Sequence, residues 1–181
     1  MSDKDVSPSK VASQAKKAFK EKRYSDALGG FYAAREGYLL DQDELRAAEM
    51  SNNLCVVMLQ IDRPNEALKI VEDTPALFLE KGDDAHAAMA YGNLASALEA
   101  CGNIDGAVSA LQEAIDGFRR IDDQENLLYS AKALSELQLR QGKALEAVAT
   151  MQTGLENQKG LGLRRRLLRR LLDIPSRLID K

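Results

Sequence analysis

Residues 93–107 read NLASALEACGNIDGA, and the same order of residue types returns at a fixed distance on either side. Forty residues earlier the chain reads NLCVVMLQIDRPNEA (53–67), and forty residues later it reads ALSELQLRQGKALEA (133–147). Each stretch has a leucine, a small residue, further apolar residues, a turn containing Gly or Pro, and an alanine. The recurrence predicts a fold assembled from copies of one structural unit.

The period of 40 extends over four units. The alanine that follows each turn is Ala27, Ala67, Ala107 or Ala147. The packed position thirteen residues earlier is Gln14, Leu54, Leu94 or Leu134, and the small residue after it is Ala15, Cys55, Ala95 or Ser135. Small residues at these places allow two helices to approach closely, so each unit is predicted to be a helical hairpin.

Residues that begin and end helices keep the same period. Asp43, Asp83 and Asp123 stand where N-cap residues are expected, and Ser7-Pro8 opens the first unit instead. Gly102 and Gly142 suit helix C-termini. The predicted helices are 8–21, 25–40, 44–60, 64–80, 84–101, 104–120, 124–141 and 144–158. Because proline lacks a backbone donor, Thr74-Pro75 predicts a kink or break inside the fourth helix.

Composition agrees with an all-α chain that lacks catalytic chemistry. Aromatic residues make up 5% of the 181 residues, and Trp is absent, which disfavours a β-sandwich. His86 is the sole histidine, and Gly160-Leu161-Gly162 lacks the third glycine of a phosphate-binding loop. Cys55 and Cys101 have no partner at metal-ligand spacing. We expect no enzyme activity, cofactor or metal site and, since no apolar leader or span is evident, a cytoplasmic location.

These motifs resemble the tetratricopeptide repeat over residues 9–158, in the longer 40-residue form found in kinesin light chains and bacterial peptide-sensing regulators. The resemblance implies a right-handed superhelical solenoid of four hairpins. The units are expected at 8–42, 43–82, 83–122 and 123–158, between a short tail at 1–7 and a basic segment at 159–181. It also implies a protein-protein interaction module, a scaffold or adaptor that holds a peptide or helix of a partner in its concave groove.

The first helix of each unit should line that groove with a polar face. The candidate partner-binding residues are Lys16, Asn52, Asn53, Val56, Met89, Asn93, Ser96, Tyr129, Lys132, Glu136 and Arg140. Asn53 and Asn93 each precede a packed leucine, and in the resembling proteins such an Asn pairs with peptide backbone; the alternative is an Asn that caps or bridges helices. Of the basic clamp that chaperone-binding relatives use, Lys16 and Asn53 match, but Ala12, Met89 and Asn93 do not. Chaperone tails are therefore not the expected ligand.

The C-terminal segment differs from the rest in charge. From Lys159 onward eight basic residues face two acidic ones, a net +6, so the preceding 158 residues carry −9. On a helical wheel, residues 161–179 place leucine and isoleucine on one half and arginine on the other. We expect this helix to cap the array. The alternatives are an adaptor that contacts an anionic membrane or nucleic acid through Arg164, Arg165, Arg166, Arg169 and Arg170, or a subunit that forms homo-oligomers through its edges.

Overall fold

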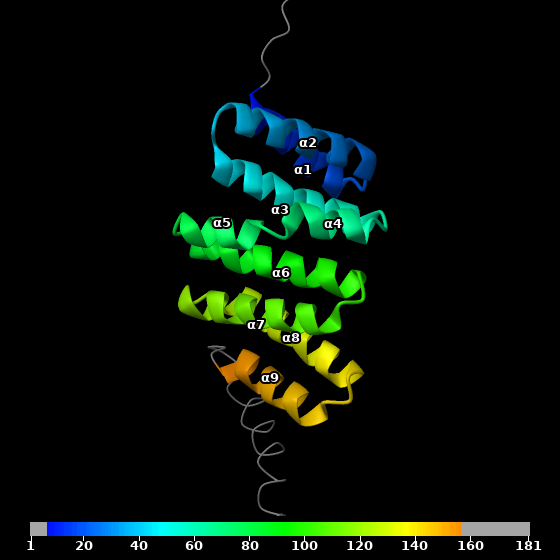
Figure 1. The fold of residues 1–181 in the computed structure, drawn as a ribbon, viewed down its shortest axis with the longest axis vertical. Coiled ribbons are helices and arrows are strands. Elements are labelled where there is room, and N and C mark those ends of the chain that lie inside the picture. Colours follow the sequence, from blue (N-terminus) through cyan, green and yellow to red (C-terminus); the bar gives the residue numbers. More distant parts are fainter. Residues whose placement is uncertain (1–6, 157–181) are drawn as a thin grey trace, which may run out of the picture.

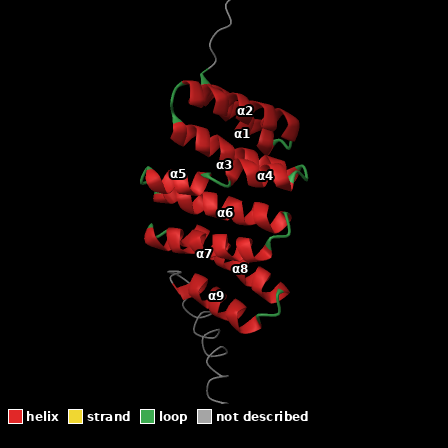
Figure 2. Cartoon of the chain, in the orientation of Figure 1, coloured by secondary structure: helices red, strands yellow, loops and turns green. Residues whose placement is uncertain are grey.

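The computed structural model describes residues 7–156, and every regular element in that range is an α-helix (Figures 1 and 2). The helices are α1 (Pro8–Lys20), α2 (Tyr24–Leu40), α3 (Glu44–Gln60), α4 (Pro64–Val71), α5 (Thr74–Glu80), α6 (Asp84–Ala100), α7 (Ile104–Arg120), α8 (Gln124–Arg140) and α9 (Ala144–Glu156). The expected helix at 161–179 and the last two residues of the helix expected at 144–158 lie outside the described residues.

The helices stack in one row as successive antiparallel hairpins (Figure 1). Their order is α1 with α2, α3 with α4 and α5, α6 with α7, and α8 with α9. We call α1, α3, α6 and α8 the A helices and the others the B helices. Each hairpin also packs on the next, as α2 does on α3 and α7 on α8. The predicted all-α hairpin array is confirmed.

The predicted break at Thr74-Pro75 is confirmed as well. The second hairpin has two short B helices, α4 and α5, separated by residues 72 and 73. Pro75 stands in the first turn of α5, where its missing N–H costs nothing. The hydroxyl of Thr74 donates to the Val71 carbonyl at 2.9 Å, which replaces part of the interrupted helix ladder.

Helix starts follow the predicted caps with one exception. The carboxylates of Asp43, Asp83 and Asp123 accept from the backbone N–H three residues ahead, in Arg46, His86 and Asn126. Each bond satisfies one of the donors that the first helical turn leaves free. Ser7 occupies the N-cap position of α1, but its side chain makes no such bond.

The hairpin turns share one backbone shape whether or not glycine is present. Gly102 and Gly142 have φ of 80° and 77°, as expected for left-handed residues after a helix. Lys22 and Asp62 have φ of 60° and 58° at the corresponding helix ends. The repeat therefore imposes the turn even where the residue does not favour it.

Small residues join the two helices of several hairpins. A Cβ added at Gly30 would stand 2.8 Å from the Ala15 Cβ, and one added at Gly117 would stand 2.7 Å from the Ala88 Cβ. A third close approach joins Gly154 to Ala131. The core clusters run from α1 to α8, and Ala147 of α9 is buried as well, as expected for a stack in which no hairpin can bury its apolar face alone. No helix within residues 7–156 is long and apolar enough to cross a membrane.

Candidate functional site

The outer surface of the A helices carries the candidate binding residues, and Asn53 and Asn93 lie at its centre. They occupy equivalent positions on α3 and α6, which are in direct contact, and both side chains are half-buried. The thiol of Cys55 donates to the Asn93 backbone carbonyl at 3.7 Å and joins the two helices beside them. Among the hydrogen bonds of residues 7–156, none uses either Asn side-chain amide. Both amides therefore have free donors and acceptors at a partly sheltered surface.

Asn52 is not part of this surface, and its expected exposure is wrong. It is buried, and its Oδ1 lies 3.1 Å from the Thr74 hydroxyl oxygen, whose single hydrogen is shared between this amide and the Val71 carbonyl. The amide ties α3 to the start of α5, at the break in the B helix. Ala12 of α1, which stands at a position of the basic clamp, is also buried. Fewer residues are therefore exposed on the A-helix surface than the sequence spacing predicted.

Exposed apolar side chains continue the A-helix surface toward the C-terminal hairpins. Met89 on α6 is 47% exposed, and Tyr129 at the equivalent position of α8 is 76% exposed. Val56 on α3 is half-buried, whereas Ser96 is exposed with its hydroxyl bonded to the Gly92 carbonyl. This part of the surface offers apolar area next to the two amides.

Charged residues lie on both sides of the surface formed by Asn53, Asn93, Met89 and Tyr129. Lys16 and Lys20 are exposed on α1 at the N-terminal side. On α8, Lys132 pairs with Glu136 at 3.9 Å, and Arg140 forms an ion pair with Glu99 of α6. The predicted residues Lys132, Glu136 and Arg140 are therefore exposed but engaged with acidic or basic neighbours.

His86 supports the wall of this surface and has no catalytic arrangement around it. Its ring stacks on Phe78 with centroids 5.3 Å apart, and its Nδ1 lies 2.7 Å from Asp83 Oδ2. The Nε2 atom lies 3.9 Å from a carboxylate oxygen of Glu49, across α3 and α6. Burial disfavours the charged form of Asp83, but the hydrogen bonds from the His86 backbone and ring outweigh it and lower the Asp83 pKa. Asp83 therefore caps α6, and His86 links α6 to α3 through Glu49.

The two cysteines also have structural surroundings. Cys55 is fully buried, and burial raises the pKa of its thiol to about 12, so it remains a neutral packing group. Cys101 is half-buried, and its thiol lies 3.6 Å from Asn65 Oδ1 at a turn. Within the described range, no group of His, Cys, Asp and Glu side chains is arranged to hold a metal ion.

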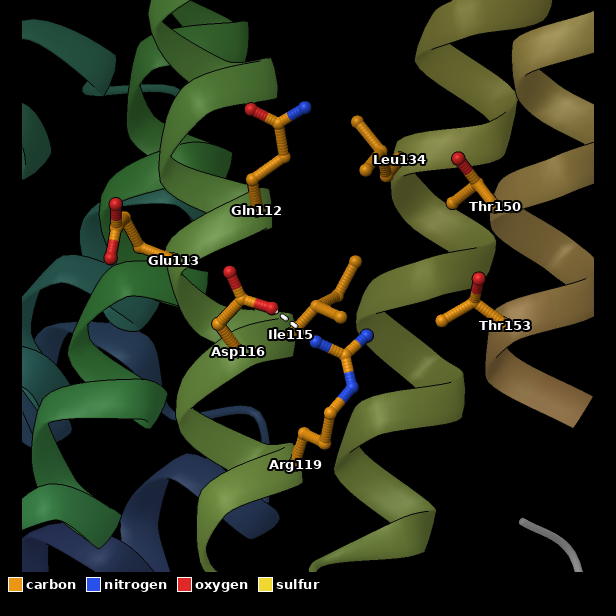
Figure 3. Close-up of a pocket in the computed structure, with 8 residues that line it drawn as sticks. All are labelled: Gln112, Glu113, Ile115, Asp116, Arg119, Leu134, Thr150 and Thr153. Carbon is orange, nitrogen blue, oxygen red and sulfur yellow. Dashed lines mark hydrogen bonds and ion pairs between the residues drawn. The ribbon is translucent and has the colours of Figure 1, made fainter. Parts of the chain in front are cut away.

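A second surface feature lies between the B helices α7 and α9 and was not predicted from the sequence. A hollow of about 370 Å³ separates α7 from α9, with Leu134 of α8 between them (Figure 3). Gln112, Glu113, Ile115, Asp116 and Arg119 lie on the α7 side, and Thr150 and Thr153 lie on the α9 side. Asp116 and Arg119 are paired with each other.

The hollow reflects smaller or more polar side chains than those of the first B helices. Two units earlier, the positions of Gln112 and Thr150 are occupied by Tyr32 and Ile70, which pack into the core clusters between α2 and α4. Comparing these equivalent pairs along the repeat is the signal that could have located the hollow.

Comparison with known proteins identifies the repeat. Residues 86–160 match the family model described as tetratricopeptide repeat. Among proteins of curated function, no significant sequence match was found.

Several solved structures share the fold at low sequence identity. BtubC (BKLC) from P. vanneervenii is 17% identical with a TM-score of 0.74, covering 81% of this chain and 61% of its own, so this chain spans less than two thirds of it. A putative kinesin light chain from Podosopora anserina with nearly identical TPR-like repeats is 15% identical with a TM-score of 0.73, covering 88% and 82%. The Rap conjugation gene regulator of a plasmid, in complex with the Phr* peptide, is 14% identical with a TM-score of 0.67, covering 82% and 42%.

Proposed function

We propose that this chain, a tetratricopeptide-repeat protein, is a non-catalytic interaction module that holds an extended peptide or a helix of a partner protein on its A-helix surface. Tetratricopeptide-repeat arrays typically mediate protein-protein interaction and are usually without catalytic activity. The observation that carries the proposal is the pair of unbonded, half-buried amides of Asn53 and Asn93 on neighbouring A helices.

An Asn side chain at such a place suits a peptide ligand. Its amide offers an acceptor oxygen and two donor hydrogens, which match the N–H and C=O groups of an extended backbone without reading its side chains. A half-buried amide strengthens such hydrogen bonds because less water competes for it. Asn53 and Asn93 stand one repeat apart, so a single ligand that crosses α3 and α6 can reach both.

The neighbouring side chains favour a particular kind of segment. Met89 and Tyr129 provide exposed apolar area on the C-terminal side of the Asn pair, and Lys16 and Lys20 provide positive charge on the N-terminal side. A segment with one or two large apolar residues and an acidic stretch would complement both. The Rap regulator is a structural relative that was solved in complex with a peptide.

The test is a binding measurement with a defined peptide. A random peptide library displayed on phage is selected against the intact chain, and the tightest peptide is synthesised with a fluorescent label. Replacing Asn53 and Asn93 together by Ala should weaken its binding by at least about tenfold, since each lost hydrogen bond at a sheltered site is worth ~1 kcal/mol. The melting temperature should stay within about 2 °C of the parent.

Two variants control for unrelated effects. Asn52→Ala removes the adjacent, buried amide and should lower the melting temperature because the contact between α3 and the start of α5 is lost and a cavity remains, while peptide affinity changes little. Gln112→Ala changes an exposed amide on a B helix and should alter neither quantity. If the double Asn variant binds the peptide normally and melts much lower, the two amides are structural and the proposal fails.

A further inference from the structure

The described array ends in an apolar surface at the hairpin of α8 and α9. Leu139 on α8 is 55% exposed, and Leu145 and Val148 on α9 are 88% and 43% exposed. The positions equivalent to Val148 are Leu28, Leu68 and Val108, and each packs in a cluster that includes residues of the next A helix. Leu59, which is equivalent to Leu139, packs in the same manner. The repeat itself therefore indicates what belongs on this end: one more A-type helix.

We propose that residues 161–179 of this same chain cover that surface in the position of a fifth A helix, with a kink at Pro175, which stands at the position of Ser135. Residue 157 follows α9 directly, and the 25 residues beyond Glu156 exceed the 17 residues of α8. In the 40-residue register, Leu167, Leu171 and Ile174 correspond to Leu127, Ala131 and Leu134, which are buried in α8. Arg165, Arg166 and Arg169 correspond to Glu125, Asn126 and Tyr129, which are exposed.

Arg170 and Arg177 fall at positions that are buried in α3, α6 and α8. The residues expected to face these arginines are polar, whereas their equivalents in earlier units are apolar. In the earlier units, Cys55 and Met58 share a cluster with Ala97 of the next A helix, and Ala95 packs in the same way with Leu137. In the last unit the corresponding pair is polar, Ser135 and Gln138, and the residue due to face it is Arg177. Apolar contacts at two junctions are thus replaced by a polar contact at the third.

The same exchange occurs at a second place. Tyr38 shares a cluster with Met50, and Phe78 shares one with Ala90. One repeat after Phe78 and Ala90, the corresponding residues are Phe118 and Ser130. Two repeats after them, the corresponding residues are Gln158 and Arg170. An aromatic position becomes an amide where the opposing position becomes a guanidinium.

The chemistry of these pairs is complementary. A guanidinium has five N–H donors and no acceptor, whereas the Gln138 side-chain oxygen and the Ser135 hydroxyl can accept. The Gln138 oxygen already accepts from the Thr150 hydroxyl at 2.8 Å, which fixes its orientation and leaves a lone pair for Arg177. The acidic charge of the preceding 158 residues, −9 against +6 for the last 23, further favours this closure.

Disulfide trapping in the intact chain tests the placement. In a Cys101→Ser background, Met151→Cys is combined with Ile174→Cys, because the equivalent residues Leu111 and Leu134 share a cluster. The matched control combines Met151→Cys with Arg169→Cys, which corresponds to exposed Tyr129. We expect an intrachain disulfide to form at least about tenfold faster in the first pair, measured by peptide mass mapping of the monomer. Equal rates, or disulfides that form only between chains, would overturn the proposal, the latter in favour of a second copy on this surface.

A coupling experiment covers the case in which trapping distorts the helix. Arg177→Leu and Gln138→Leu should each lower the melting temperature, and the double variant should recover most of the loss because it restores the apolar pairing of the earlier junctions. Two losses that simply add, or no loss from Arg177→Leu, would contradict the assignment. If Arg177→Leu leaves melting unchanged but abolishes sedimentation with phosphatidylserine vesicles, the segment is a membrane-targeting helix instead.

Discussion

The first and last described hairpins differ in what they turn away from the array. On α1, the residues Lys10, Gln14 and Lys17 occupy positions that in α3 are Met50, Leu54 and Val57, all buried against the preceding hairpin. On α8 and α9, Leu139, Leu145 and Val148 remain exposed. An end helix with a polar outer face needs nothing beyond it, whereas an apolar end needs a cover. The contrast indicates that α1 already finishes the N-terminal end of the described stack.

Truncation should separate the two ends most strongly. Removing residues 159–181 is expected to lower the melting temperature by about 10 °C, because leaving Leu139 and Val148 uncovered costs ~3–5 kcal/mol and each kcal/mol is worth about 2–4 °C in a chain of this size. Removing residues 1–6 should change it by less than about 1 °C. Differential scanning fluorimetry of both variants provides the comparison, and similar melting temperatures for the two would contradict it.

Making the N-terminal end resemble the interior should produce self-association. Gln14→Leu with Lys17→Leu restores the apolar character that α3 has at Leu54 and Val57 and creates an exposed apolar patch. We expect dimers or larger species by light scattering at concentrations where the parent chain is monomeric, with the monomer's melting temperature little changed. Gln112→Leu, on an exposed B-helix surface, is the control. A double variant that stays monomeric would mean that the polar face of α1 has no protective role.

Much of this architecture could be predicted from the sequence because its determinants are local and repeated. The Asp N-caps act within three residues, and the break before Pro75 follows from one missing donor. The helix boundaries agree with the predicted ranges within a few residues, apart from that break.

The parts that sequence reasoning missed depend on contacts between elements. Asn52 lies on the expected groove face by spacing, but the broken B helix brings Thr74 against it and buries the amide. The hollow between α7 and α9 depends on the combined size of Gln112 and Thr150, two side chains on different helices. Periodicity within a single helix indicates neither contact.

Glycine substitutions should measure how tightly each end is held. Gly117→Ala places a Cβ 2.7 Å from that of Ala88 in an interior hairpin, and Gly154→Ala places one 2.8 Å from that of Ala131 in the last described hairpin. Overpacking costs ~1–3 kcal/mol, and the gain in helix propensity returns about 1 kcal/mol. We expect Gly117→Ala to lower the free energy of unfolding by about 1–2 kcal/mol. Gly154→Ala should lower it by less, because α9 packs mainly on α8 in the described array and can shift, whereas α7 is held between α6 and α8. Urea titrations would measure both, and a larger loss at Gly154 would show that the last hairpin is held as rigidly as the interior.

Salt should produce the smallest change in melting temperature. Its effect measures how much electrostatic attraction contributes to the packing of residues 161–179 on the last hairpin. The last 23 residues carry +6 and the preceding 158 carry −9, so their attraction should weaken as the Debye length falls from about 14 Å at 50 mM salt to about 4 Å at 500 mM. Exposed ion pairs are worth ~0–1 kcal/mol, so the full chain should lose only about 1–3 °C in melting temperature over this range. The chain truncated after Gln158 has lost the attraction but keeps the self-repulsion of its −9 charge, so salt should leave it unchanged or raise its melting temperature slightly. The gap between the two variants should therefore narrow with salt without closing, because the leucine and isoleucine contacts are insensitive to screening. A gap that disappears at 500 mM would mean that charge alone holds the segment, and a gap that stays constant would mean that the arginines contribute nothing to it.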